Sequence, residues 1–144
     1  MSESLNQNFN HLKVHTQYSI CEGAAKIDDL QEYCKSNKIK SLGISDTSNL
    51  CGALEFAEKI SKSGTQPIIG TQINFKLNDT TGLLPLFALN ETGYKNIIEL
   101  SSNSYLGNDE LSDPHVNFDE LLKNSDGVSV FSGTVLGLFG KLFD

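Results

Sequence analysis

Short apolar runs alternate along this chain with longer amphipathic stretches. Apolar or aromatic side chains recur every three or four residues at Ile27, Leu30, Tyr33 and Cys34, which predicts a helix over 28–36. The amphipathic stretches farther along predict helices over 49–61, 91–102, 118–122 and 135–143. The apolar runs between the helices predict strands over 12–14, 39–44, 67–75, 83–89 and 127–132.

This order of elements is typical of an α/β fold with mostly parallel strands and helical crossovers. A polar cluster over 78–82 is an exception and predicts a hairpin-like connection between the third and fourth strands. Pro85 lies inside the fourth strand, which favours a sheet edge or a strand start nearby. In such sheets, functional residues gather in the loops that follow the strands. Here those loops begin at His15, Asp46, Gln72, Asn90 and Ser132.

The composition narrows the class of protein. The chain has 144 residues, of which 38% are hydrophobic, so we expect one domain, or part of one, with a real core. The net charge of −7 disfavours a surface that grips DNA by itself. The three cysteines have no metal-like spacing, and their odd number disfavours a disulfide framework. Neither a secretory leader nor an apolar run near the roughly 18 residues of a membrane span is found, so we expect a cytoplasmic protein.

Two groups of polar residues at predicted strand ends are candidates for chemistry. His11, Lys13 and His15 alternate along the first strand, so their side chains share one face. Neutral imidazoles bind Zn, Mn or Fe, but the Lys13 ammonium repels cations, so these residues alone favour structural histidines over a metal site. Asp46 follows the second strand, where a carboxylate serves either catalysis or the N-cap of the next helix, and base rates favour the cap. No Walker-type loop, dinucleotide-binding glycine motif or Ser-His-Asp pattern is present.

Five stretches, taken in order, resemble the PHP (polymerase and histidinol phosphatase) domain of the bacterial DNA polymerase III alpha subunit. No single stretch is specific, but their order and spacing together are. The stretches are 9–19 (FNHLKVHTQYS), 23–27 (GAAKI), 46–52 (DTSNLCG), 67–70 (PIIG), and 88–90 with 93–96 (ALN and GYKN), and the weaker 131–133 (FSG) extends the match.

The resemblance implies a particular fold. The family has a distorted (β/α)7 barrel, similar to a TIM barrel and roughly twice as long as this chain. We therefore expect residues 9–144 to form the first part of such a barrel, incomplete at its C-terminal side, after a flexible segment over 1–8. The palm, fingers and thumb of the polymerase would lie beyond Asp144.

Metal-binding members of the family hold cations with His, Asp, Glu and Cys side chains at the strand ends. Their His-x-His pair falls on Lys13 and His15 of this chain, and a carboxylate falls on Glu22. The histidine that follows the family's aspartate falls on Thr47, next to Asp46.

Three further ligand positions fall on uncharged residues, of which Leu83 cannot ligate at all and Gln72 is a weak ligand. A glutamate falls on Gln72, a histidine on Leu83 and a cysteine on Thr134. We therefore expect no catalytic residue and no metal, but a vestigial site at His11, Lys13, His15, Glu22, Asp46, Thr47, Gln72, Leu83 and Thr134. We also expect the Lys13 ammonium to sit among His15, Glu22 and Asp46 in place of a cation. Lys13→Ala would then leave carboxylates unpaired and destabilise the fold by a few kcal/mol.

The resemblance favours a catalytically inactive domain of a replicative DNA polymerase. In that role the domain supports the polymerase chain and binds the separate proofreading exonuclease subunit, with little nucleic-acid contact and no cofactor. One alternative is an active metal-dependent phosphoesterase or 3′–5′ exonuclease with Zn, Mn or Fe at His11, His15, Glu22 and Asp46. Another is a flavodoxin-like module for a ligand or partner, against which no glycine-rich phosphate loop follows the first strand.

Overall fold

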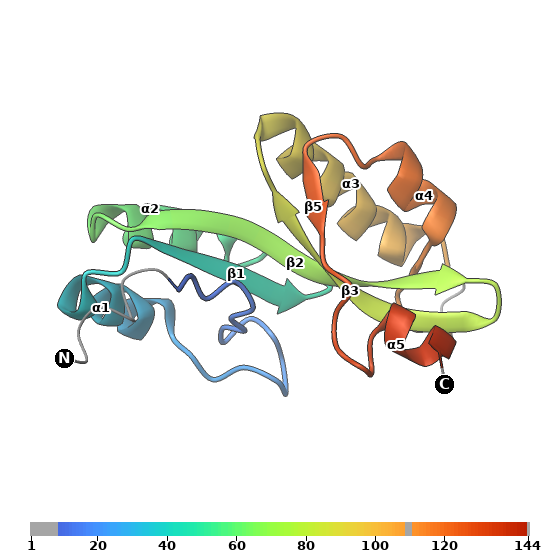
Figure 1. The fold of residues 1–144 in the computed structure, drawn as a ribbon, viewed down its shortest axis with the longest axis horizontal. Coiled ribbons are helices and arrows are strands. Elements are labelled where there is room, and N and C mark those ends of the chain that lie inside the picture. Colours follow the sequence, from blue (N-terminus) through green and yellow to red (C-terminus); the bar gives the residue numbers. More distant parts are fainter. Residues whose placement is uncertain (1–8, 109–110, 144) are drawn as a thin grey trace.

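The computed structural model describes residues 9–108 and 111–143, drawn in colour in Figure 1. The predicted flexible segment over 1–8 lies outside these residues. The helices are α1 (Ile27–Asn37), α2 (Ala53–Lys62), α3 (Glu91–Leu106), α4 (Phe118–Lys123) and α5 (Leu138–Phe143). The strands are β1 (Ser41–Thr47), β2 (Gln66–Leu77), β3 (Thr80–Ala88), β4 (Val116–Asn117) and β5 (Val128–Val130). In the described part of the chain, no helix is long and apolar enough to cross a membrane.

The strands form one mixed sheet in the order β1-β2-β3-β5, with β4 paired to β2. β1 and β4 run parallel to β2, whereas β2 with β3 and β3 with β5 are antiparallel. The prediction of a mostly parallel sheet is therefore wrong. The pair that was not expected is β3 with β5, which is antiparallel. The predicted hairpin-like connection over 78–82 is confirmed, because β2 and β3 pair antiparallel around a short link at Asn78 and Asp79. Asn78 supplies the left-handed backbone of this link, with φ of 54°.

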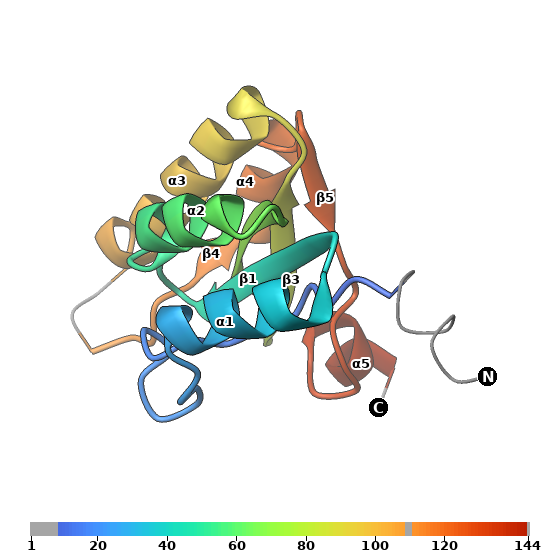
Figure 2. The ribbon, with the colours of Figure 1, turned by 90° about the vertical axis from the view of Figure 1, so that its left-hand side faces the viewer.

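Two apolar cores hold the sheet and its helices together. Ile27 and Cys34 of α1 pack with Phe56 and Ile60 of α2 against Leu42 and Ile44 of β1. Figure 2 shows these two helices side by side against β1. The larger core joins β2 and β3 with α3, α4 and α5; its fully buried members include Ile73, Phe75, Leu84, Leu86, Ile97, Leu100 and Leu138.

The predicted first strand, over 12–14, lies beside β1 but is not a regular strand. The backbone N–H of Gly43 donates to the His11 carbonyl at 2.7 Å, and that of Ser45 donates to the Val14 carbonyl at 2.8 Å. A Cβ at Gly43 would lie 2.8 Å from Leu12 Cα, so a glycine is needed for this close approach. The segment therefore continues the sheet beyond β1 and delivers Lys13 and His15 to its edge.

Two details of the C-terminal half differ from the sequence prediction. Pro85 lies inside β3, paired with Gln72 of β2, and its carbonyl accepts the N–H of Phe131 at 2.9 Å on the other side. In an antiparallel ladder, the N–H and the C=O of one residue point to the same neighbouring strand. Proline has no N–H, so Pro85 leaves one hydrogen bond unmade, on the side of β5 and just past the end of that strand. The predicted helix over 135–143 begins only at Leu138, because a turn closed from Gly137 N–H to the Thr134 carbonyl at 2.8 Å precedes it.

Candidate functional site: a polar cavity at the strand ends

Six of the nine positions predicted for a vestigial site line one cavity of about 250 Å³. They come from the segment beside β1, from the loop that follows it, from β2 and β3, and from the turn before α5. These residues are Lys13, His15, Glu22, Gln72, Leu83 and Thr134, and Pro85, Gly133, Leu136 and Gly137 complete the wall. The folding of this chain therefore gathers residues that are up to 121 positions apart, from 13 to 134, at one place.

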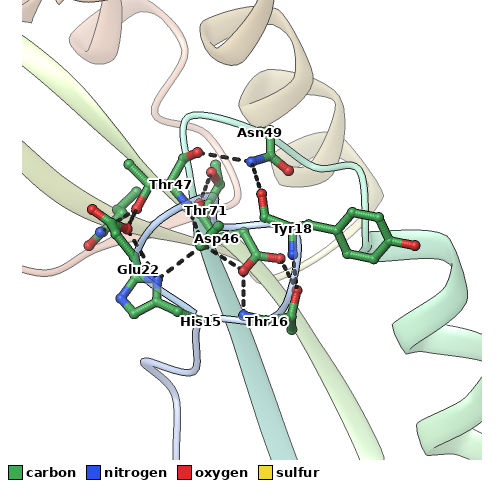
Figure 3. Close-up of polar contacts among 10 residues, drawn as sticks. His15, Thr16, Tyr18, Glu22, Asp46, Thr47, Asn49 and Thr71 are labelled. Carbon is green, nitrogen blue, oxygen red and sulfur yellow. Dashed lines mark hydrogen bonds and ion pairs between the residues drawn. The ribbon is translucent and has the colours of Figure 1, made fainter. Parts of the chain in front are cut away.

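Asp46 lies beside this cavity and is fully engaged with the loop over 16–23. Asp46 is the last but one residue of β1 and is buried, with 1% of the residue exposed. The carboxylate accepts the Thr16 N–H at 2.6 Å, the Thr16 hydroxyl at 2.7 Å and the Ser19 hydroxyl at 2.8 Å (Figure 3). The helix-capping interpretation of Asp46 is wrong, because α2 starts only at Ala53 and has no side-chain cap. The hydrogen bonds of Asp46 instead hold the conformation of the loop that carries Glu22.

Thr47 connects β2 to the same loop. The side-chain amide of Gln72 donates to Thr47 Oγ1 at 2.7 Å, and Thr47 Oγ1 donates to the Glu22 carboxylate. His15 Nδ1 lies 4.0 Å from Glu22 Oε2 and 3.4 Å from Ser19 Oγ. At three positions where metal-binding relatives would place ligands, this chain therefore has a row of ordinary hydrogen bonds.

Lys13 does not take the place that we expected for it. The residue is exposed and makes none of the ion pairs found within 9–108 and 111–143. The carboxylate of Asp46 is satisfied by Thr16 and Ser19, so the expected contact with Lys13 is absent from this structure. The predicted loss of a few kcal/mol in Lys13→Ala no longer follows, because that carboxylate stays paired without Lys13.

His11 lies outside the cavity. It is exposed, and its ring packs edge-on against Phe9 with the centroids 4.8 Å apart. The four residues of the alternative metal site are therefore not brought together, since His11 and Asp46 do not line the space that His15 and Glu22 share.

The donors at this cavity do not fit a hydrolytic metal centre. Such centres need several anionic or imidazole ligands and an open position for an activated water. The lining has one imidazole, His15, and one carboxylate, Glu22, beside the neutral Gln72 and Thr134, the aliphatic Leu83 and the cationic Lys13. Over the residues that the structure describes, no group of three or more His, Cys, Asp or Glu side chains could hold a metal ion.

Sequence reasoning did not predict a polar network that joins the loop over 16–23 to α2, and α2 to α1. The Tyr18 hydroxyl donates to Glu55 at 2.7 Å, and Lys59 bonds both Glu55, at 2.8 Å, and Asp28. Hydrogen bonds from Lys59 and Tyr18 lower the pKa of Glu55, and those to Asp28 and Glu55 raise the pKa of Lys59. The spacing of Glu55 and Lys59 indicates a helical pair, but nothing local reveals that Tyr18 joins it.

Comparisons with known proteins agree with this architecture. The family model described as "PHP domain" matches residues 11–144. The DNA polymerase III subunit alpha of Rickettsia felis is 37% identical over 134 residues, which are 92% of this chain and 11% of that protein. The subunits of Caulobacter vibrioides and Haemophilus influenzae are 36% and 35% identical over 99% and 92% of this chain. The chain thus spans about an eighth or less of these relatives, between 11% and 13%.

Solved structures share the fold at low sequence identity. A protein described as a metal-dependent phosphoesterase, from Bifidobacterium adolescentis, superposes with a TM-score of 0.53 at 20% identity, over 66% of this chain and 32% of that one. An amidohydrolase from Chromobacterium violaceum superposes with a TM-score of 0.54 at 14% identity, over 68% of this chain and 34% of that one. Together, the family match and the identity to alpha subunits show that this chain belongs to the PHP domain family, in the branch found in bacterial DNA polymerase III alpha subunits.

Proposed function

We propose that this chain is the PHP region of a replicative DNA polymerase alpha subunit and that it does not hydrolyse phosphoesters. The chain would then support the polymerase polypeptide and dock the separate proofreading exonuclease, while polymerisation would belong to the rest of the protein. We propose further that the mixed sheet is the first part of a distorted seven-stranded barrel. Among the described residues, β5 pairs only with β3, and the segment over 9–15 lies beside β1 at the other end of the strand order. These two edges are where further strands would join.

The observation that carries the proposal is the content of the cavity. Leu83 has no donor atom, and Lys13 adds a positive charge where cations would bind. At 4 Å and an effective dielectric constant near 20, one unit of like charge costs about 4 kcal/mol, and a divalent cation experiences about twice that cost. The single carboxylate of Glu22 offsets at most this one positive charge, so the cavity offers a cation no net negative charge. A water molecule activated by two or three bridged cations has no ligand set here.

The charge of the chain supports a protein-docking role. The net charge is −7, whereas affinity for nucleic acid depends on clustered lysine and arginine side chains. Several large apolar side chains are exposed, which suits burial against other polypeptides; they include Ile20, Leu54, Leu106, Val135, Leu136 and Phe143.

Two assays on the purified chain test this proposal. We expect no release of nitrophenol from bis-p-nitrophenyl phosphate with Zn²⁺, Mn²⁺ or Fe²⁺ added, and we expect the proofreading subunit to co-elute with the chain in size-exclusion chromatography. A PHP domain with an intact ligand set serves as the positive control for hydrolysis. Metal-dependent turnover that is abolished by His15→Ala would contradict the inactive assignment, and the absence of co-elution would contradict the docking role.

A further inference from the structure

β5 lies at one end of the strand order, and one side of its backbone is free in the described part of the chain (Figure 1). The N–H of Phe131 donates to the Pro85 carbonyl at 2.9 Å, so Phe131 directs its backbone groups to β3. These groups alternate in direction along an antiparallel strand, so Val128 and Val130 direct theirs to the free side. Of the groups on that side, the Val128 N–H donates to the Ser125 carbonyl at 3.1 Å, and the others have no partner among the described residues.

This free edge lacks the features that usually protect one. Natural sheets guard their edges with charged side chains, prolines or irregular backbone. No charged residue and no proline occurs over 127–140, and Val130 and Phe131 are 39% and 44% exposed. At the other end of the strand order, the segment over 9–15 carries Lys13 and is irregular. Of the two borders, the β5 edge is therefore the one suited to pairing with a further strand.

We propose that two copies of this chain pair through β5, antiparallel and across a two-fold axis. The sequence Val128-Ser129-Val130 reads the same in both directions, so a two-fold axis at Ser129 places each valine opposite a valine of the second copy. Each Val130 N–H then donates to the Val128 carbonyl of the other copy, which makes two new backbone hydrogen bonds. Cross-strand pairs of β-branched side chains add to the stability of such a ladder.

Charge and shape both favour a second copy as the occupant of this edge. Each copy has a net charge of −7, so two copies repel each other overall, whereas the stretch over 127–140 is uncharged. The same axis brings Phe131 opposite Gly127 of the second copy, and an aromatic side chain across from a glycine stabilises strand pairing. The Phe131 ring already packs edge-on against Phe87 with the centroids 5.3 Å apart, which holds it on that face of the sheet.

This inference goes beyond the proposed function, because the pairing of two copies does not depend on whether the cavity binds a metal. The second copy uses the same backbone groups as a further strand of the barrel, so the two exclude each other. A longer polypeptide that supplies such a strand should therefore not pair in this way.

Sedimentation equilibrium of the 144-residue chain over a range of concentrations tests the pairing, and we expect a reversible equilibrium between one copy and two. Val130→Pro removes the N–H that crosses the interface and none that faces β3. Two lost hydrogen bonds should weaken the dimer by about tenfold or more. Val135→Pro, in the same uncharged stretch, is the matched control, because residue 135 is the second residue of the turn closed from Gly137 N–H to the Thr134 carbonyl, where proline is favoured. This variant should dimerise like the wild type.

A chain that stays monomeric at every concentration would overturn the pairing, as would a dimer that both proline variants leave equally strong. Open-ended assembly in place of a closed pair would contradict the two-fold axis. If Val130→Pro does not fold, Val130→Lys places a charge at the edge and should give the same loss, with Val135→Lys as its control. Amide hydrogen exchange adds a local measurement, because the Val130 N–H should become more protected as the concentration rises. An unprotected Val130 N–H in the dimer would show that the copies meet through another surface.

Discussion

Thr47, the last residue of β1, is paired with Gln72 in the middle of β2, and the Gln72 amide donates to the Thr47 hydroxyl at 2.7 Å. In metal-binding relatives, the matching positions are a glutamate and a histidine, as the resemblance implies. A carboxylate and an imidazole at these positions both bind cations, whereas here the amide nitrogen donates to the hydroxyl oxygen. This pair therefore has a hydrogen bond between two positions that the resemblance assigns to metal ligands.

Restoring the lost ligands should restore metal binding. We expect a variant that combines Lys13→His, Thr47→His, Gln72→Glu, Leu83→His and Thr134→Cys to bind Zn²⁺ or Mn²⁺ in at least stoichiometric amount, because these side chains then converge with His15 and Glu22 on one cavity. Isothermal titration calorimetry measures the stoichiometry. A matched variant with alanine at the same five positions should bind none. Equal binding by both variants would show that the cavity does not govern metal affinity.

Asp46 should matter for stability because three donors depend on its carboxylate. Asp46→Asn replaces one acceptor oxygen by a donor, which faces either Thr16 or Ser19 unfavourably. We expect the free energy of unfolding to fall by about 2–4 kcal/mol, since buried hydrogen bonds to a charged group are among the strong ones. Urea denaturation measures this loss, with Asp79→Asn in the exposed β2–β3 turn as the control. Equal midpoints for the two variants would argue against an anchoring role.

Gly93 should tolerate no larger side chain. A Cβ at this position of α3 would lie 1.8 Å from the Gly127 carbonyl oxygen, in backbone that cannot move aside cheaply. We expect Gly93→Ala to destabilise the fold by about 1–3 kcal/mol, the usual cost of overpacking. Gly107→Ala is the matched control, because the nearest atom to its Cβ would be 3.1 Å away. Thermal unfolding compares the two, and a smaller loss at Gly93 than at Gly107 would contradict the packing described here.

The Glu55 network should make stability depend on acid pH. Hydrogen bonds from Lys59 and Tyr18 lower the folded-state pKa of Glu55 below its ordinary value of 4.5. A lowered pKa contributes stability that is fully present above the unfolded value and is lost as the pH falls through the folded value. The difference in urea midpoint between wild type and Glu55→Gln should therefore be largest near neutral pH and shrink below about pH 4.5. Glu58→Gln, on the exposed side of the same helix, is the control, and a difference that grows on acidification would have the wrong sign.

Local patterns predicted most elements of this fold and the β2–β3 hairpin, but not the pairing of strands that are distant in sequence. The helical spacing of Ile27, Leu30 and Cys34 reproduces α1 to within a residue at each end, because one buried stripe determines a helix. The antiparallel pair of β3 with β5 depends on contacts between distant residues, such as Phe87 with Ser129, which no local window contains. The segment over 12–14 has the composition of a strand but makes too few ladder bonds to become one.

At the candidate site, too, the sequence predicted which residues come together but not which partners they bond. Alignment with family motifs placed Lys13, Gln72, Leu83 and Thr134 at one cavity, where the structure also has them. The partners of these residues could not be read from the sequence. Whether Asp46 would bond Lys13 or Thr16 depends on how a loop of polar residues folds, and small hydroxyl side chains such as Ser19 carry no periodic signal. The conformation of this loop therefore determines which groups pair with the Asp46 carboxylate.

The metal content of the chain purified without chelators tests the central claim most directly. Inductively coupled plasma mass spectrometry should find Zn, Mn and Fe well below one equivalent per chain, both as isolated and after dialysis against each ion. His15 and Glu22 alone form too small a ligand set to retain a divalent cation beside Lys13. Two or three equivalents of tightly held metal, together with chelator-sensitive hydrolysis of a phosphoester, would contradict the account and identify a working nuclease or phosphatase.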